Sequence, residues 1–180
     1  MLSINIKEQT KAGHLELEKT VVKELKAIRS DADYAAFLKK FYTYFSQVEQ
    51  VISPYITEQL LPDYADRRNS SYLKNDIEAL GGTVNDIPKV AVPDVENTLQ
   101  ALGALYVMEG SIMGGRIIVQ MLEKGGITKG VSFFSGYGAA TGERWSLFTD
   151  VMNAQAKNDF DEKLAIDAAN QTFSDFGKVF

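Results

Sequence analysis

The sequence contains no cysteine, and this absence excludes several kinds of chemistry at once. Disulfide bonds, thiolate metal sites and a cysteine nucleophile all need at least one such side chain. Histidine occurs only once, as His14, so zinc or di-iron sites built from two or three imidazoles are excluded as well. Any histidine chemistry in this chain therefore depends on His14 alone.

The chain also lacks a basic cluster and a long apolar run. It has 19 Lys and Arg against 24 Asp and Glu, a net charge of -5. A nucleic-acid partner needs concentrated positive charge, so we expect none. No uninterrupted apolar run reaches the roughly 18 residues that span a bilayer, and the charged N-terminal segment does not resemble a signal peptide. We therefore expect a protein of the cytoplasm with no membrane partner.

Apolar residues recur at helical spacing along nearly the whole chain, whereas the alternation typical of strands is almost absent. Of the 180 residues, 45% are hydrophobic, which is enough for a substantial core. The sequence predicts one all-α domain over residues 1–180, with about six helices. The expected helices cover residues 6–28, 34–52, 60–80, 94–124, 142–157 and 160–178.

Short polar residues mark where several of these helices should begin. We expect Asp31 or Asp33 to cap the second helix and Asp94 to cap the fourth. Asp159 with Glu162 resembles a capping box for the last helix. The carboxylates of "PDYADRR" are expected to be solvated.

His14 lies on the apolar stripe of the first expected helix, in line with Leu17 and Val21, so we expect it to point toward the core. Glu18 is one turn away and within side-chain reach. One interpretation is a histidine at the edge of the core that is hydrogen-bonded to Glu18. The other is a ligand to haem iron, which needs a single neutral imidazole. Glu18 would then orient the ring, and Lys7, two turns earlier, would meet a haem propionate.

The segment "YVMEGSIMGGRII", residues 106–118, places three glycines inside an apolar helix. Each glycine in a helix interior costs about 1 kcal/mol relative to alanine. Gly110 and Gly114 share a face, flanked by Ser111 and Gly115. Glycine lets a backbone approach a flat ligand closely and permits a kink. Tight packing of one helix against another explains the same residues equally well.

Five segments resemble the haem oxygenase family, most closely the bacterial type found beside bacteriophytochromes, and they occur in the family's order. They are "IKEQTKAGHLELE", "RRNSSYLKNDIEALGG", "ALGALYVMEGSIMGGRII", "FFSGYGAATGERWSLF" and "AIDAANQTFSDFGKVF". The resemblance implies a helical fold that holds haem b between the first helix and a kinked, glycine-rich distal helix. It also implies oxidative cleavage of haem to biliverdin, carbon monoxide and iron.

The resemblance assigns roles to individual residues. His14 would be the axial ligand, with Glu18 as its partner and Lys7 and Thr10 at the family spacing. Gly110, Gly114 and Gly115 would form the distal wall. The resemblance further implies dioxygen as co-substrate, an external electron donor such as a ferredoxin or a flavodoxin reductase, and a bacteriophytochrome as a receiver of the bilin.

The chain departs from the family pattern at two places. Ser111 stands where many members have an aspartate that orders water, although a serine hydroxyl can also hold a water. Trp145 and Thr149 stand where some relatives have basic residues for the propionates, so Arg144 or Arg116 would substitute. Tyr137 could face the haem or anchor its loop. Ser111 keeps open the alternative of a non-catalytic haem- or bilin-binding protein of the same fold.

Overall fold

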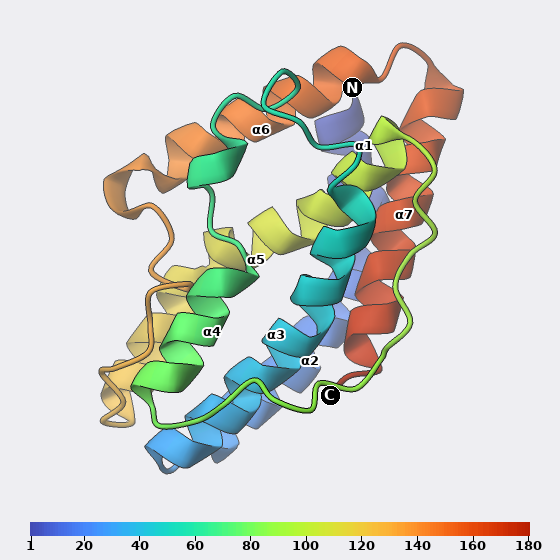
Figure 1. Ribbon diagram of the computed structural model, residues 1–180. Helices are drawn as coiled ribbons and strands as arrows, with labels where there is room; N and C mark the ends of the chain where they lie inside the picture. The colour runs from blue at the N-terminus through green and yellow to red at the C-terminus, as the bar shows by residue number, and fades with distance from the viewer.

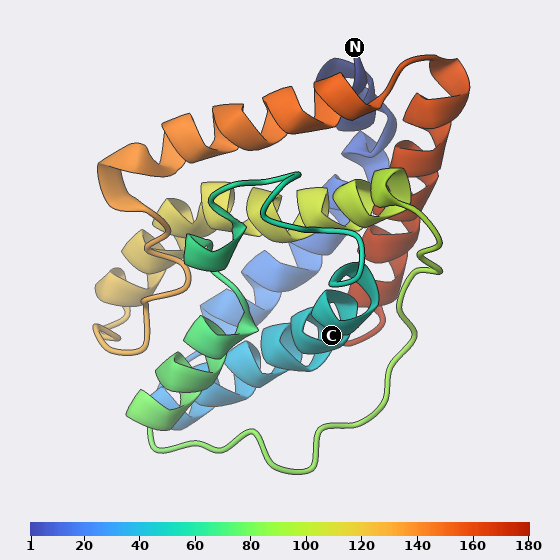
Figure 2. The same ribbon diagram turned by 45° about the horizontal axis from the view of Figure 1, so that its top comes forward.

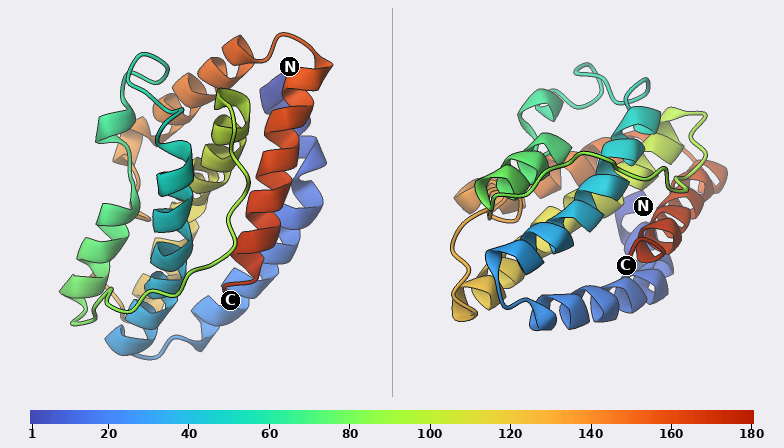
Figure 3. Two further views of the ribbon diagram at one scale, coloured as in Figure 1. Left: turned by 45° about the vertical axis from the view of Figure 1, so that its right-hand side comes forward. Right: turned by 60° about the horizontal axis from the view of Figure 1, so that its bottom comes forward.

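The computed structural model describes residues 1–180 and contains helices but no strands, which confirms the all-α prediction (Figure 1). Helix α6 runs along α5, α7 lies beside α2, and a long irregular segment returns the chain from α4 to α5 (Figures 2 and 3). The helices are α1 (Leu2–Gln9), α2 (Lys11–Ala27), α3 (Asp31–Ile52), α4 (Ser70–Ala79), α5 (Thr98–Lys124), α6 (Thr141–Gln155) and α7 (Asp159–Gly177), with short 3-10 turns η1 (Tyr64–Asp66) and η2 (Gly138–Ala140).

Several predicted boundaries are wrong. The expected helix over residues 60–80 starts ten residues later, as α4, and is preceded by the short turn η1. Other boundaries differ by a few residues. The first expected helix is interrupted at Thr10, where α1 ends and α2 begins. The side chain of Ser30, rather than an aspartate, caps α3 by accepting a hydrogen bond from the Asp33 N–H. Likewise Asn97, not Asp94, caps α5, and Asn158, not Asp159, caps α7. Serine, asparagine and aspartate all cap helices well. The local sequence therefore predicts roughly where a helix begins, but not which of several neighbouring polar residues caps it.

Aromatic side chains of α3 and α7 form the centre of a core of 35 buried hydrophobic residues. The rings of Phe41 and Phe176 meet edge to face at 4.9 Å, and those of Tyr44 and Phe176 stack at 4.9 Å. The Tyr44 hydroxyl donates to the Thr172 carbonyl at 2.9 Å, so its burial leaves no polar group unpaired. This aromatic contact fixes α7 against α3.

Helix α5 crosses the middle of the protein and packs most extensively against α7. By length and composition alone it could span a membrane, but half of its most apolar window is buried within the fold, as in the core helix of a globular protein. It is one helix from Thr98 to Lys124, and the expected kink stays a prediction.

The partly buried Glu49 connects α3 to the start of α4. Burial raises the pKa of its carboxyl group, although the N–H and hydroxyl of Ser70 bind the carboxylate and oppose the shift. The folded state therefore keeps this proton to higher pH than the unfolded chain, so the contribution of Glu49 to stability falls as pH rises above the ordinary value of 4.5.

We expect Glu49→Gln to make the slope of unfolding free energy against pH more positive above pH 4.5. Urea unfolding at several pH values measures this slope. Glu58→Gln, at an exposed position near the same end of α3, is the matched control and should leave the slope unchanged. A Glu49→Gln slope equal to that of the wild type would contradict the assignment.

Candidate functional site

His14 lies on the buried side of α2, but its own side chain is exposed, so the expectation that it points into the core is wrong. At 100° per residue, Val21 and Leu25 lie about 20° to either side of His14 around the helix axis. Those two residues are only 9% and 6% exposed. The same helix face is therefore covered by protein in its later turns and uncovered at the turn of His14.

The imidazole is held at one edge only. Its ring meets Phe173 of α7 edge to face, with centroids 5.8 Å apart, and a Cβ on the preceding Gly13 would lie 3.3 Å from the Phe173 Cβ. No hydrogen bond joins His14 to Glu18, and both Glu18 and Lys7 are exposed. The histidine is therefore positioned by α7 while its polar atoms remain available to a ligand.

The glycines of α5 divide into two groups that face different surroundings. A Cβ on Gly103 would lie 2.1 Å from the Ala165 carbonyl oxygen, and one on Gly115 would lie 2.2 Å from that of Phe134. Both are contacts that only glycine allows. A Cβ on Gly110 or Gly114 would meet nothing within 4 Å. Close packing therefore explains Gly103 and Gly115, and it does not explain Gly110 and Gly114.

Gly103, Gly110 and Gly114 nevertheless lie on one face of α5, since Gly103 is about 20° and Gly114 about 40° from Gly110 around the axis. This face packs against α7 at Gly103 and is uncovered from Gly110 onward. Met113 and Ile117 border the uncovered part and are 41% and 66% exposed. Large apolar side chains that remain exposed beside bare backbone are typical of a site for an apolar ligand.

The chemical groups on these two uncovered faces are of the kinds that bind haem. Helices α2 and α5 contact each other and both pack on α7. Helix α2 presents the imidazole of His14, and α5 presents glycine backbone flanked by apolar side chains. A planar, mostly apolar macrocycle with an iron that needs one protein nitrogen matches this donor set. Haem is the group that these residues would hold.

The other residues predicted for the haem site differ in whether their polar groups already have partners within the protein. Arg116 and Lys7 are exposed and make no ion pair. The Ser111 hydroxyl donates to the Val107 carbonyl at 3.0 Å, which leaves its oxygen lone pairs to accept from water. Thr10 is buried, and its hydroxyl donates to the Ile6 carbonyl at 2.7 Å. It supports the junction of α1 and α2.

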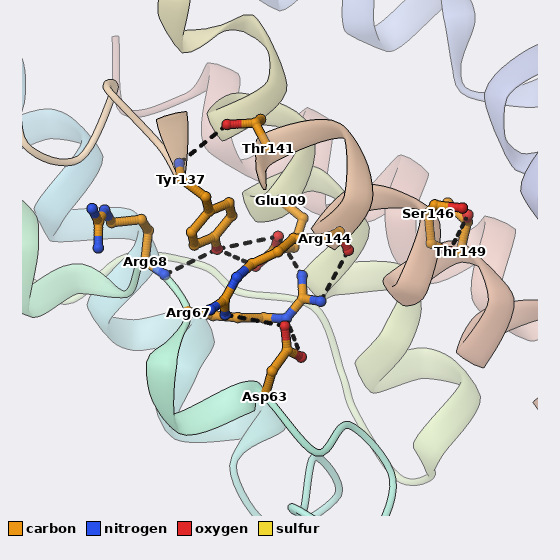
Figure 4. Close-up of polar contacts among 9 residues, drawn as sticks. All are labelled: Asp63, Arg67, Arg68, Glu109, Tyr137, Thr141, Arg144, Ser146 and Thr149. Carbon is orange, nitrogen blue, oxygen red and sulfur yellow. Dashed lines mark hydrogen bonds and ion pairs between the residues drawn. The ribbon is translucent and has the colours of Figure 1, made fainter. Parts of the chain in front are cut away.

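Arg144 and Tyr137 belong instead to a buried polar network, shown in Figure 4. Arg144 pairs with Asp63 at 3.1 Å. The Tyr137 hydroxyl contacts Glu109 at 3.3 Å and accepts from the Arg68 N–H at 3.0 Å, so it anchors the loop. Arg67 pairs with Glu109 at 2.8 Å and with Asp63 at 2.9 Å. The expectation that the carboxylates of "PDYADRR" are all solvated is therefore wrong for Asp63.

Sequence analysis did not identify the Arg67–Glu109 pair, although one signal was available. Glu109 is the only acidic residue between Thr98 and Leu122, inside an otherwise apolar helix. A lone carboxylate in such a position has to be paired when it is buried. Its partner is 42 positions away, and no local pattern identifies it.

Comparisons with known proteins identify a family for this chain. The family model described as Heme oxygenase matches residues 1–180. A Heme oxygenase of Xanthomonas campestris pv. campestris is 34% identical over 96 residues, which cover 52% of this chain and 56% of that relative. Heme oxygenase PigA of Pseudomonas aeruginosa is 24% identical over 173 residues, which cover 94% of this chain and 86% of that relative. The chain thus spans little more than half of the first relative and most of the second.

Proposed function

The chain belongs to the haem oxygenase family, and we propose that it cleaves haem oxidatively to biliverdin, carbon monoxide and iron. The reaction uses dioxygen and electrons from an external donor. The observation that carries the proposal is the pairing of a single uncovered imidazole on α2 with uncovered glycine backbone on α5. When bound, haem supplies both the iron that activates dioxygen and the ring that is opened.

The protein contributes binding, orientation and shielding. His14 would hold the iron through one ring nitrogen, and Glu18, one turn further along α2, would accept the other ring N–H and fix the tautomer. With haem in place, the bare backbone at Gly110 and Gly114 would leave the space for a small gas molecule that a side chain would otherwise fill. Met113 and Ile117 present apolar surface beside this backbone and exclude water.

Lys7 and Arg116 are the basic residues available to the haem propionates, since Arg144 is already paired with Asp63. Ser111 can hold a water beside Gly110, in place of the aspartate of many family members. The electron donor, a bacteriophytochrome that receives the bilin, and a cytoplasmic location stay predictions.

Turnover of bound haemin tests the proposal and separates it from the carrier alternative. We expect haemin, reductant and air to give loss of the Soret band, growth of a bilin band and an extractable pigment, with carbon monoxide and iron released in equal amounts. A protein that binds haemin and keeps its spectrum unchanged through many electron equivalents would be a carrier and would contradict the proposal.

A further inference from the structure

One buried guanidinium joins three separate segments of the chain beside α5. Arg67 is only 1% exposed. Its Nε donates to Asp63 Oδ1 at 2.9 Å, its Nη1 to Glu109 Oε2 at 2.8 Å, and its Nη2 to the Arg144 carbonyl at 3.0 Å. The three partners precede η1, lie within α5 and lie in the first turn of α6 (Figure 4). Each of the three nitrogens of the Arg67 side chain therefore donates a hydrogen bond to a different segment of the chain.

The surrounding groups extend the network. Arg67 and Arg144 pair with the carboxyl groups of Asp63 and Glu109. Arg68 adds a further cation, which lies over the Tyr72 ring and has a buried Nε without a hydrogen-bond partner. Arg144 binds the second oxygen of Asp63 at 3.1 Å. The Tyr137 hydroxyl accepts from the Arg68 N–H and lies between that group and Glu109. All three nitrogens of the Arg67 side chain are paired, and buried groups paired in this way favour one arrangement of their elements over others.

The network lies directly beside the uncovered part of α5. Glu109, which is 3% exposed, is the residue before Gly110. On α6, Trp145 follows Arg144. The centroid of its ring lies 5.5 Å from that of Tyr106 of α5. The hydrogen bonds of Arg67 thus set the spacing of α5 and α6 at the turn where the glycine backbone becomes uncovered.

We propose that Arg67 is a positioning residue: through Glu109 and the Arg144 carbonyl it fixes the α5 backbone at Gly110, and thereby the orientation in which haem presents its meso carbons. This inference rests on the proposed function. A well-packed apolar pair can stabilise a core as well as a buried ion pair does, so stability alone does not account for the network. The planar fork of arginine can hold three partners in fixed directions, whereas the ammonium group of lysine cannot.

Hydrogen exchange in the haem-free protein tests the positioning directly. Arg67→Lys keeps the charge and removes the fork. We expect amides of residues 107–116 and 141–146 to exchange about tenfold faster than in the wild type, with α3 unchanged, because only the local opening is favoured. Arg29→Lys, at an exposed arginine, is the matched control and should change neither segment. Equal acceleration in every helix, or none, would overturn the proposal.

Tyr137→Phe provides a second variant if Arg67→Lys does not fold, because it removes only the hydroxyl between Arg68 and Glu109. It should accelerate exchange in the same two segments by a smaller factor. Unchanged exchange in Tyr137→Phe would then overturn the proposal.

The ratio of bilin isomers gives a readout that a purely stabilising role would not move. Haem has four meso carbons, so a change in its orientation changes which isomers form. We expect Arg67→Lys to shift the isomer ratio and Arg29→Lys to keep that of the wild type. A wild-type ratio in Arg67→Lys would overturn the proposal. Failure of the wild type to form any bilin would refute the proposed function, and the exchange result would still decide whether Arg67 positions α5.

Discussion

Replacing His14 by alanine is expected to abolish bilin formation and to weaken haemin binding by at least about 100-fold. The removal of a group that merely orients a metal ligand costs about 10–100-fold in affinity, so loss of the ligand itself should cost more. His14 is the only histidine in the chain, and no second imidazole can replace it. Haemin titration followed by absorbance measures the affinity, and single-turnover assays measure the pigment.

Because His14 is exposed, its replacement should affect haemin binding without affecting the stability of the fold. Because the side chain is exposed and makes only an edge contact with Phe173, His14→Ala should change the free energy of unfolding by no more than about 0.5 kcal/mol. Added imidazole should restore the spectrum of the His14→Ala complex. Glu18→Gln is the graded control, with a loss of about 10–100-fold in affinity. Wild-type spectra and turnover in His14→Ala would show that another group binds the iron.

The second large effect is expected at Gly114, where a side chain would enter the space assigned to the haem. Gly114→Leu should weaken haemin binding by roughly 5–150-fold, the range that corresponds to an overpacking cost of about 1–3 kcal/mol. In the haem-free protein nothing lies within 4 Å of the new Cβ, so the fold should tolerate the change. Gly114→Ala should even stabilise that protein, by up to about 1 kcal/mol, through its better helix propensity.

Gly115 provides the control for the predicted effect on stability, and Gly142 provides the control for the predicted effect on haemin affinity. Gly115→Ala should destabilise the haem-free protein by about 1–3 kcal/mol, because its Cβ would meet the Phe134 backbone at 2.2 Å. Gly142→Ala, at an open position of α6, should leave haemin affinity unchanged. Thermal unfolding and haemin titration of all four variants give the result. Undiminished haemin affinity in Gly114→Leu would place the haem elsewhere.

The sequence predicted which residues share a helix face but not what covers that face. Helical periodicity correctly placed His14 in line with Val21, since an angle around a helix is a local property. Whether a side chain on that line is buried depends on neighbouring helices, so the expected burial of His14 was wrong. The same limit applies to the glycines: α7 packs directly on Gly103, whereas a Cβ on Gly110 would meet nothing within 4 Å.

The polar network shows a second limit of sequence analysis. Glu109 is visible as an isolated acid in an apolar helix, but Arg67, Asp63 and Arg144 come from two other segments that only the tertiary fold brings together. The resemblance to haem oxygenases suggested the proposed function, which the properties of single residues did not identify. The chain departs from the family pattern at Ser111 and in α6. At these positions the family's residue roles cannot be carried over to this chain.

A crystal structure of the haemin complex tests the central claim most directly. It should show iron bound by a ring nitrogen of His14, with the opposite side of the porphyrin against the backbone of Gly110 and Gly114. A complex in which iron binds any other residue, or in which the porphyrin lies away from α5, would contradict it.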